Sequence, residues 1–185
     1  MAAMEALGVS AGAGGEHARE RLIVLDASGQ VIRVVEGLEG RVEFPSDMAG
    51  MLASPEAQLT LVHNHPASNG LSPYDLVQLE KPGVHAVVAV GHDGSVYVAA
   101  RGASYDAAIH PEAASAAQRL QRRERDPKKR AAFDQHFHHV MALALHDVRV
   151  IEYRSMLSLE RRRSFDRGAG FLSRVRGVAG TAVGK

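Results

Sequence analysis

Two histidines separated by one residue stand at the end of an apolar run in LVHNHPASNGLSPYDLVQ, residues 61–78. If that run is a strand, His63 and His65 point to the same side, because side chains alternate across a strand. Asp75 follows His65 by ten residues, and the Pro, Asn, Gly and Ser residues between them allow the loop to fold back. Two imidazoles and one carboxylate leave zinc an open fourth position, as in catalytic zinc sites. The stretch therefore predicts a zinc site.

The composition limits which metal such a site would hold. The chain has no cysteine, which excludes thiolate ligands and favours zinc or a similar borderline ion over an iron–sulfur cluster. The same absence leads us to expect a reducing, cytoplasmic compartment. The 185 residues suffice for a real core, and no window approaches the ~18 apolar residues of a membrane span. We therefore expect a globular protein without a membrane partner.

Water at a metal of this kind needs a base, and a glutamate at the end of another strand would supply one. Glu36 ends an apolar run just before Gly37, whereas Glu39 and Glu43 lie farther along. Its placement at a strand end makes Glu36 the candidate base.

The hydrophobic pattern predicts the elements that position these residues. Apolar runs at 22–25 and 31–35 flank turn residues and predict a hairpin. Residues 46–54, between two prolines, predict a short helix, and residues 59–63 predict a buried strand that ends at the histidines. A second hairpin is predicted over residues 85–102, with an Asp-Gly turn.

The second half of the chain has a mainly helical pattern. Helical periodicity begins near Pro111, breaks at Asp126-Pro127 and resumes over residues 131–148; residues 149–156 suggest a strand. We divide the chain into a flexible Gly/Ala-rich lead-in, a metallohydrolase core, a helical extension and a basic flexible tail: 1–17, 18–110, 111–167 and 168–185.

Residues 20–102 carry a family resemblance. His63-Asn64-His65-Pro66 followed by Ser72-Pro73-Tyr74-Asp75, with Glu36 upstream, resembles the JAMM (JAB/MPN-plus) metalloprotease signature, and the wording is similar to bacterial RadC-like and phage- or toxin-associated JAB domains. The resemblance implies an α/β fold: a mixed sheet flanked by helices in a deaminase-like three-layer arrangement, here with a helical C-terminal extension. One departure is the loop 66–74, which has nine residues where ten are common. We expect the flexible part of the loop to absorb it.

The resemblance also implies roles for individual residues. His63, His65 and Asp75 would ligate zinc, and Glu36 would take a proton from the attacking water and pass it to the leaving amine. Ser72 would donate a hydrogen bond to the oxyanion. The reaction would be hydrolysis of a peptide or isopeptide bond in a protein or peptide substrate, with a ubiquitin-like tail as one candidate.

Two other functions stay open. Residues 1–100 carry 5 Lys+Arg against 12 Asp+Glu, a net of −7, whereas residues 101–185 carry 17 against 9, a net of +8. A metal-dependent hydrolase could use that basic half to bind nucleic acid, although no aromatic residues are interleaved with the basic run 119–130. The other alternative is a non-catalytic JAB-fold module for protein contacts.

A second histidine cluster lies on the predicted helix 131–148. His136 and His139 are three residues apart and could share an ion, with His138 and His146 nearby. We interpret these as solvent-facing histidines on an amphipathic helix, beside an apolar stripe that packs in the core.

Overall fold

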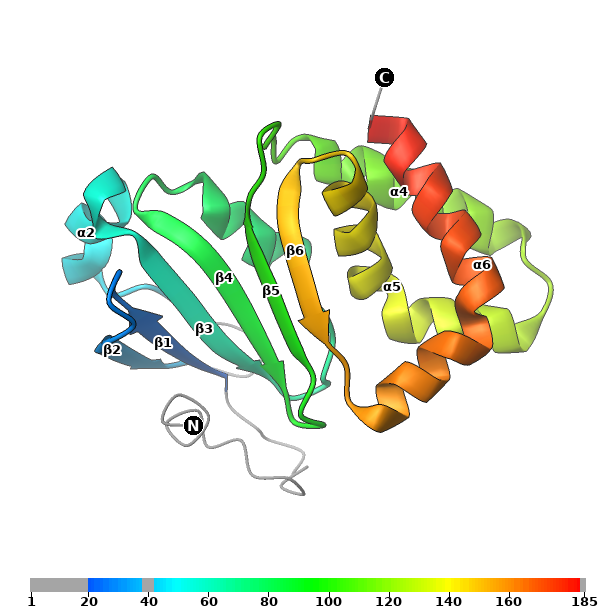
Figure 1. The fold of residues 1–185 in the computed structure, drawn as a ribbon, viewed down its shortest axis with the longest axis horizontal. Helices are drawn as coiled ribbons and strands as arrows, with labels where there is room; N and C mark the ends of the chain where they lie inside the picture. The colour runs from blue at the N-terminus through cyan, green and yellow to red at the C-terminus, as the bar shows by residue number, and fades with distance from the viewer. Residues whose placement is uncertain (1–19, 38–41, 184–185) are drawn as a thin grey trace.

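The computed structural model describes residues 20–37 and 42–183, which form an α/β fold around a six-stranded mixed sheet (Figure 1). The strands are β1 (Arg21–Leu25), β2 (Val31–Glu36), β3 (Leu59–His65), β4 (Val84–Gly91), β5 (Val96–Arg101) and β6 (Ile151–Met156). The helices are α2 (Ala49–Ala53), α3 (Pro73–Leu76), α4 (Ile109–Arg123), α5 (Pro127–Asp147) and α6 (Leu159–Val183), with short 3₁₀ turns at Ser46–Met48, Pro55–Ala57 and Val77–Glu80. The predicted lead-in, 1–17, lies outside the described residues.

The sheet has the strand order β2-β1-β3-β4-β5-β6. All neighbouring strands are antiparallel except β3 and β4, which are parallel. A parallel pair needs a crossover connection, and here it consists of the loop after His65, α3 and the turn Val77–Glu80. The crossover begins where β3 ends, so it starts at the two histidines.

Most of the local predictions are confirmed. Both hairpins form, with Gly29 and Gly94 at their turns in the left-handed region, at φ values of 80° and 82°. The short helix ends before Pro55, and the second long helix begins at Pro127, where the Asp126 side chain accepts a hydrogen bond from the Lys128 amide.

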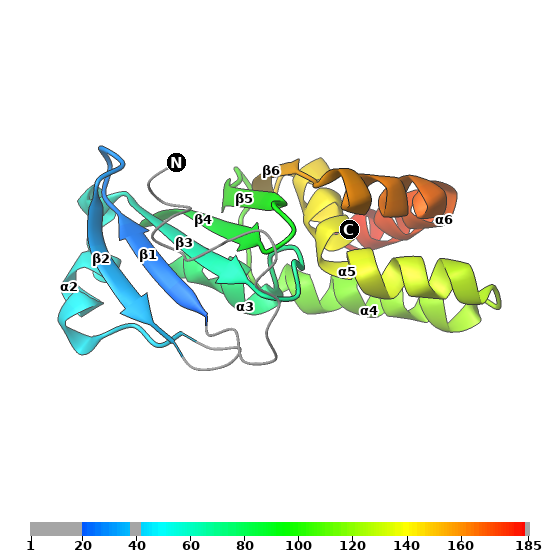
Figure 2. The same cartoon turned by 90° about the horizontal axis from the view of Figure 1, so that it is seen from below.

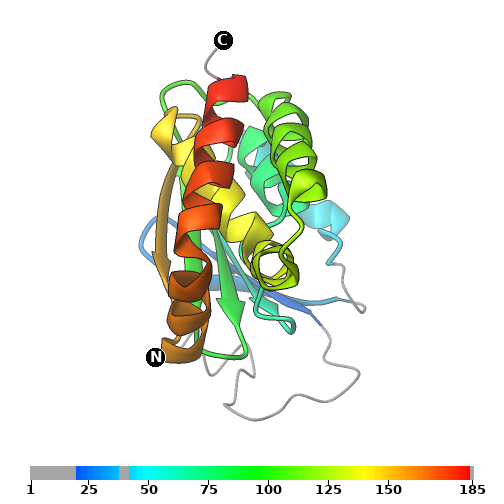
Figure 3. The ribbon, with the colours of Figure 1, turned by 90° about the vertical axis from the view of Figure 1, so that its right-hand side faces the viewer.

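The main core lies between one face of the sheet and the helices. Figure 2 shows α2, α3 and α4 on that face, and Figure 3 shows α4, α5 and α6 side by side. On the opposite face, the described residues form a small buried cluster of Ile23, Val62 and Val90. β6 pairs with β5 along its whole length, so the predicted helical extension also supplies the last strand of the sheet.

The prediction of a flexible tail over residues 168–185 is wrong, because α6 continues to Val183. The glycines suggested a loose segment, but the apolar residues among them recur at helical spacing and are buried: Phe171, Leu172, Val175 and Ala179. Gly168 permits close packing on α5, since a Cβ there would lie 2.7 Å from the Cβ of Ala132. Within the described residues, no helix is long and apolar enough to cross a membrane.

The contact at Gly168 gives a test of the α5–α6 packing. Gly170 lies in the same helix with no atom within 4 Å of an added Cβ. Gly170→Ala should stabilise the fold by about 1 kcal/mol through helix propensity. Gly168→Ala should leave the protein about 1–3 kcal/mol less stable than Gly170→Ala, because the helices must move apart. Urea unfolding of the two variants measures the difference, and equal stability would contradict this packing.

Candidate metal centre

The two histidines come from the last three residues of β3, on the face that carries the main core. His63 lies opposite Leu22 of β1 and Ala89 of β4, and its side chain is buried. His65 stands one alternation farther along, on the same face. Their Nε2 atoms are 2.8 Å apart. The alternation inferred from the sequence therefore brings both imidazoles to one point.

Asp75 reaches the histidines through a capping box at the start of α3. The Ser72 amide donates to Asp75 Oδ2 at 2.6 Å, and the Asp75 amide donates to Ser72 Oγ at 3.3 Å. Pro73 occupies the first turn, where its missing N–H costs nothing. These local bonds fix the carboxylate, which lies 3.1 Å from His63 Nε2 through Oδ1 and 3.5 Å from His65 Nε2 through Oδ2.

The three side chains fit a zinc ion. Ligand atoms at 2.0–2.1 Å from a tetrahedral ion lie roughly 3.3 Å apart. The separations of 2.8, 3.1 and 3.5 Å among these atoms are close to that value. In addition, His65 Nδ1 donates to the Asn69 carbonyl at 2.9 Å, which leaves the Nε2 lone pair for an ion. In the described part of the chain, this is the one group of three such side chains whose ligand atoms converge.

Charge coupling within the trio of His63, His65 and Asp75 shifts the pKa values of Asp75 and His65. Burial would raise the pKa of Asp75, but hydrogen bonds from His63 and His65 hold it far below its usual range. Burial would lower the pKa of His65, yet the bond to the Asp75 carboxylate raises it overall. The carboxylate is therefore ionised throughout the physiological range, as a metal ligand must be.

The structure does not bring Glu36 to the trio. Glu36 pairs with Arg21, which in turn lies beside Asn64, so Glu36 belongs to the sheet face opposite His63. Its carboxylate accepts a hydrogen bond from Arg21 Nη2 at 2.8 Å, and its side chain is 60% exposed. The prediction that Glu36 lies beside the histidines is therefore wrong. Glu36 ends the predicted hairpin, but its side chain is on the opposite face of the sheet.

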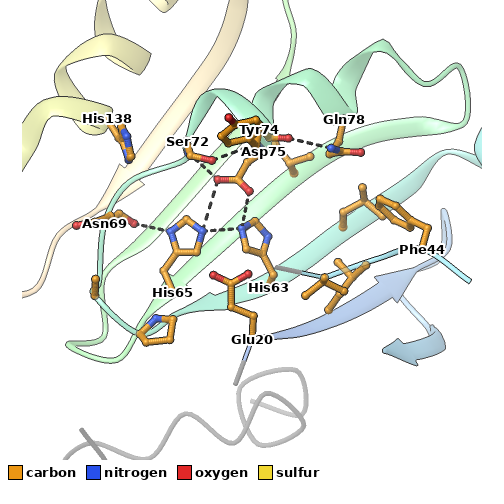
Figure 4. Close-up of a pocket in the computed structure, with 16 residues that line it drawn as sticks. Glu20, Phe44, His63, His65, Asn69, Ser72, Tyr74, Asp75, Gln78 and His138 are labelled. Atoms are coloured by element: carbon orange, nitrogen blue, oxygen red, sulfur yellow. Dashed lines mark hydrogen bonds and ion pairs between the residues drawn. The ribbon is translucent and has the colours of Figure 1, made fainter. Parts of the chain in front are cut away.

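Glu20 takes the place expected for Glu36. Because Leu22 lies opposite His63 in the antiparallel β1–β3 pair, Glu20 comes beside His65 and shares its face. Figure 4 shows its carboxylate pointing toward the two imidazole rings. Burial raises the pKa of Glu20, against an opposite effect of His65 and His63. The sequence held one signal for Glu20 that was missed: it precedes Leu22 by two residues, and side chains two residues apart on a strand share a face.

A cavity of about 600 Å³ contains all these groups (Figure 4). Ser72 lines it, and its Oγ accepts a hydrogen bond from the Asp75 amide, which leaves the Ser72 hydroxyl able to act as a donor. His138 of α5 also lines the cavity. The loop from β3 packs against α5 at Gly70, where a Cβ would lie 3.0 Å from the His139 amide nitrogen. The helical region therefore contributes to the cavity wall.

The interpretation of His136 and His139 as solvent-facing residues is wrong. Both are buried: His136 Nε2 lies 3.1 Å from Ser164 Oγ, and His139 Nδ1 lies 2.8 Å from Tyr153 Oη. Burial lowers the pKa of each to about 4, so both are neutral at physiological pH. They join α5 to α6 and β6 rather than forming a second metal site.

The site combines three side chains that could hold a metal ion with a nearby glutamate, Glu20. Such a set can hold an ion with an open position and place a base beside it. Comparison with protein-family models, curated proteins and solved structures found no match to this chain.

The raised pKa of His65 gives a prediction about metal affinity. Zinc binds the neutral imidazole, so binding must release the proton that His65 carries below its raised pKa. Affinity should therefore fall by up to about tenfold per pH unit on acidification below that pKa. Titration calorimetry in two buffers of different ionisation enthalpy measures the released proton. His65→Ala should abolish tight binding, and zinc affinity independent of pH would contradict the assignment.

Proposed function

We propose that this protein is a zinc-dependent hydrolase of amide bonds in peptides or proteins, of the JAMM type. The observation that carries the proposal is the convergence of His63, His65 and Asp75 with the Glu20 carboxylate beside them in one cavity. The His-x-His-Pro and Ser-x-x-Asp units that resemble the JAMM signature supply four of the residues that meet there: His63, His65, Ser72 and Asp75.

His63, His65 and Asp75 would hold the ion. Zinc bound there would supply Lewis acidity, polarising the scissile carbonyl and acidifying a water. Glu20 would accept the proton of the attacking water and deliver it to the departing amine. Its raised pKa suits both directions of that transfer, because a base with a pKa nearer neutrality is also a better acid.

Ser72 would act on the carbonyl oxygen. Its Oγ is already an acceptor for the Asp75 amide, so its own hydrogen can be donated to oxygen as negative charge develops there. Because the same capping box orients Asp75, the loop positions a ligand and an oxyanion donor together. A peptide or protein substrate would present its amide bond to this cavity.

The nucleic-acid alternative has less support. The basic run 119–130 lies on the connection between α4 and α5, at the end of the helical region that Figure 2 shows farthest from β1 and β2. No residue of this run lines the cavity that contains His63, His65 and Asp75. The geometry thus favours amide over phosphodiester hydrolysis.

The chain offers a matched pair of glutamates for the test. In the zinc-loaded protein, Glu20→Gln should lower cleavage of a quenched fluorescent peptide library by about 10²–10⁴-fold, the usual contribution of a general base. Glu36→Gln, which changes the same residue type on the opposite face, should cleave like wild type. Both variants should hold about one zinc per chain by elemental analysis. A Glu20→Gln variant as active as wild type, or a zinc-loaded wild type that cleaves no peptide, would refute the function.

A further inference from the structure

The cavity has an apolar arm beside the metal centre. Five apolar side chains line it: Leu22, Val42, Phe44, Leu61 and Val87. Leu22 belongs to β1, Leu61 to β3 and Val87 to β4, while Val42 and Phe44 follow β2. Most of the polar lining residues lie around the histidines, whereas Gln78 lies on the same side as Phe44 (Figure 4). Figure 4 shows Phe44 on the far side of His63 from His65 and Asn69. An apolar part of the cavity wall thus adjoins the histidines.

The register of the sheet explains why the two parts adjoin. Leu61 precedes His63 by two residues on the same face of β3, Leu22 is the β1 partner of His63, and Val87 is the β4 partner of Leu61. Two residues of strand span about 7 Å. That distance is about the length of a side chain on the substrate residue next to the amide bond held at the metal centre.

The side chains that form the apolar arm are held in place by packing in the core. Leu22, Leu61 and Val87 belong to the buried core, and the Lys81 ammonium lies 5.3 Å above the Phe44 ring. Two further lining residues lie near the surface: the Gln78 amide donates to the Tyr74 carbonyl at 2.8 Å, and Tyr74 is 83% exposed. A floor of packed residues and an accessible rim are typical of a preformed ligand site.

We propose that this arm is a subsite for a branched or aromatic apolar side chain on the residue directly beside the scissile amide. The proposal rests on the proposed function, because it assigns the substrate class of the same centre. It selects peptides with Leu, Ile, Met or Phe at that position over those with glycine. Filling an apolar pocket gives about 10- to 100-fold discrimination.

The test uses hydroxamates that bind zinc and differ only in their apolar group. The zinc-loaded protein should bind 4-methylpentanohydroxamate and 3-phenylpropanohydroxamate about 10- to 100-fold more tightly than acetohydroxamate. Val42→Asp should remove that preference while keeping the affinity for acetohydroxamate. Val34→Asp is the control, since Val34 is an exposed valine that does not line the cavity, and it should keep the preference.

The outcomes separate the two proposals. If wild type binds acetohydroxamate but shows no preference for the larger groups, or if Val42→Asp keeps the preference, the subsite is refuted and the metal centre stands. If wild type binds neither zinc nor acetohydroxamate, the proposed function and the subsite both fail.

A separate observation concerns Arg161 at the start of α6. Arg161 is buried, with 9% exposure, and its guanidinium donates hydrogen bonds to three parts of the fold. Nε donates to Asp93 Oδ2 at 2.9 Å, Nη1 to the Gln135 carbonyl at 3.2 Å and Nη2 to the Ala67 carbonyl at 3.4 Å. Arg161 therefore connects α5 and the β4–β5 turn to the loop that follows His65.

The same loop has a second attachment at Ser68. Ser68 lies in the left-handed region at φ 54°, a conformation that non-glycine residues rarely adopt. It is held there by the Asp93 amide, which donates to its Oγ at 3.0 Å, and by Tyr97 Oη, which donates to its carbonyl at 3.3 Å. The next residue, Asn69, supplies the carbonyl that orients His65.

We infer that Arg161, through Asp93 and Ala67, is a positioning residue for the ligand His65. The C-terminal helix would then control metal affinity without contacting the metal. Loss of an outer contact of this kind typically costs 10- to 100-fold in metal affinity.

The test compares two arginines of α6, Arg161 and Arg176, each of which pairs with an aspartate of another element. Arg161→Lys and Arg161→Ala should weaken zinc binding about 10- to 100-fold in competition titrations. Arg176→Ala removes the α6 ion pair with Asp147 of α5 and should lower thermal stability without changing zinc affinity. If Arg161→Ala does not fold, Arg161→Lys and Asp93→Asn decide the outcome. Folded Arg161 and Asp93 variants with wild-type zinc affinity would overturn the inference.

Discussion

The arrangement of the centre depends on one carboxylate placed against two imidazoles. Asp75 lies within 3.1 and 3.5 Å of the Nε2 atoms of His63 and His65, although all three side chains are largely withdrawn from water. Burial of a charge is costly unless it is paired, so the carboxylate must be held rigidly in position. The capping box at Ser72 holds Asp75, and the Asn69 carbonyl holds His65. Local hydrogen bonds to the backbone thus hold the three side chains together despite the free-energy cost of removing a charge from water.

The topology brings the remaining group to the same place. β3 and β4 are parallel, so their crossover leaves from the carboxyl end of β3 and returns Asp75 over it. β1 is antiparallel to β3, and its beginning therefore lies beside the same end. Glu20 immediately precedes β1 and faces the cavity as a consequence. A mixed sheet therefore brings Glu20 together with His63, His65 and Asp75, although residues 20 and 75 are 55 positions apart.

The C-terminal helices are part of this construction rather than an appendage. α5 packs against the loop after β3 and lines the cavity with His138, while α6 reaches the same loop through Arg161. Their own packing uses buried histidines such as His136, whose neutral imidazole bonds across to Ser164 of α6. The sequence indicated helices here and a strand over residues 149–156, but not that the helices would form part of the cavity wall.

Local patterns determined the hairpins, the strand into the histidines and the grouping of His63, His65 and Asp75, because alternation and turn chemistry act over a few residues. Glu20 and Glu36 show where such patterns end. Both flank predicted strands, and their local sequences do not distinguish them. Only the register of β1 against β2 and β3 decided that Glu20 faces the cavity and Glu36 faces away, since a shift of one residue reverses the face of every side chain.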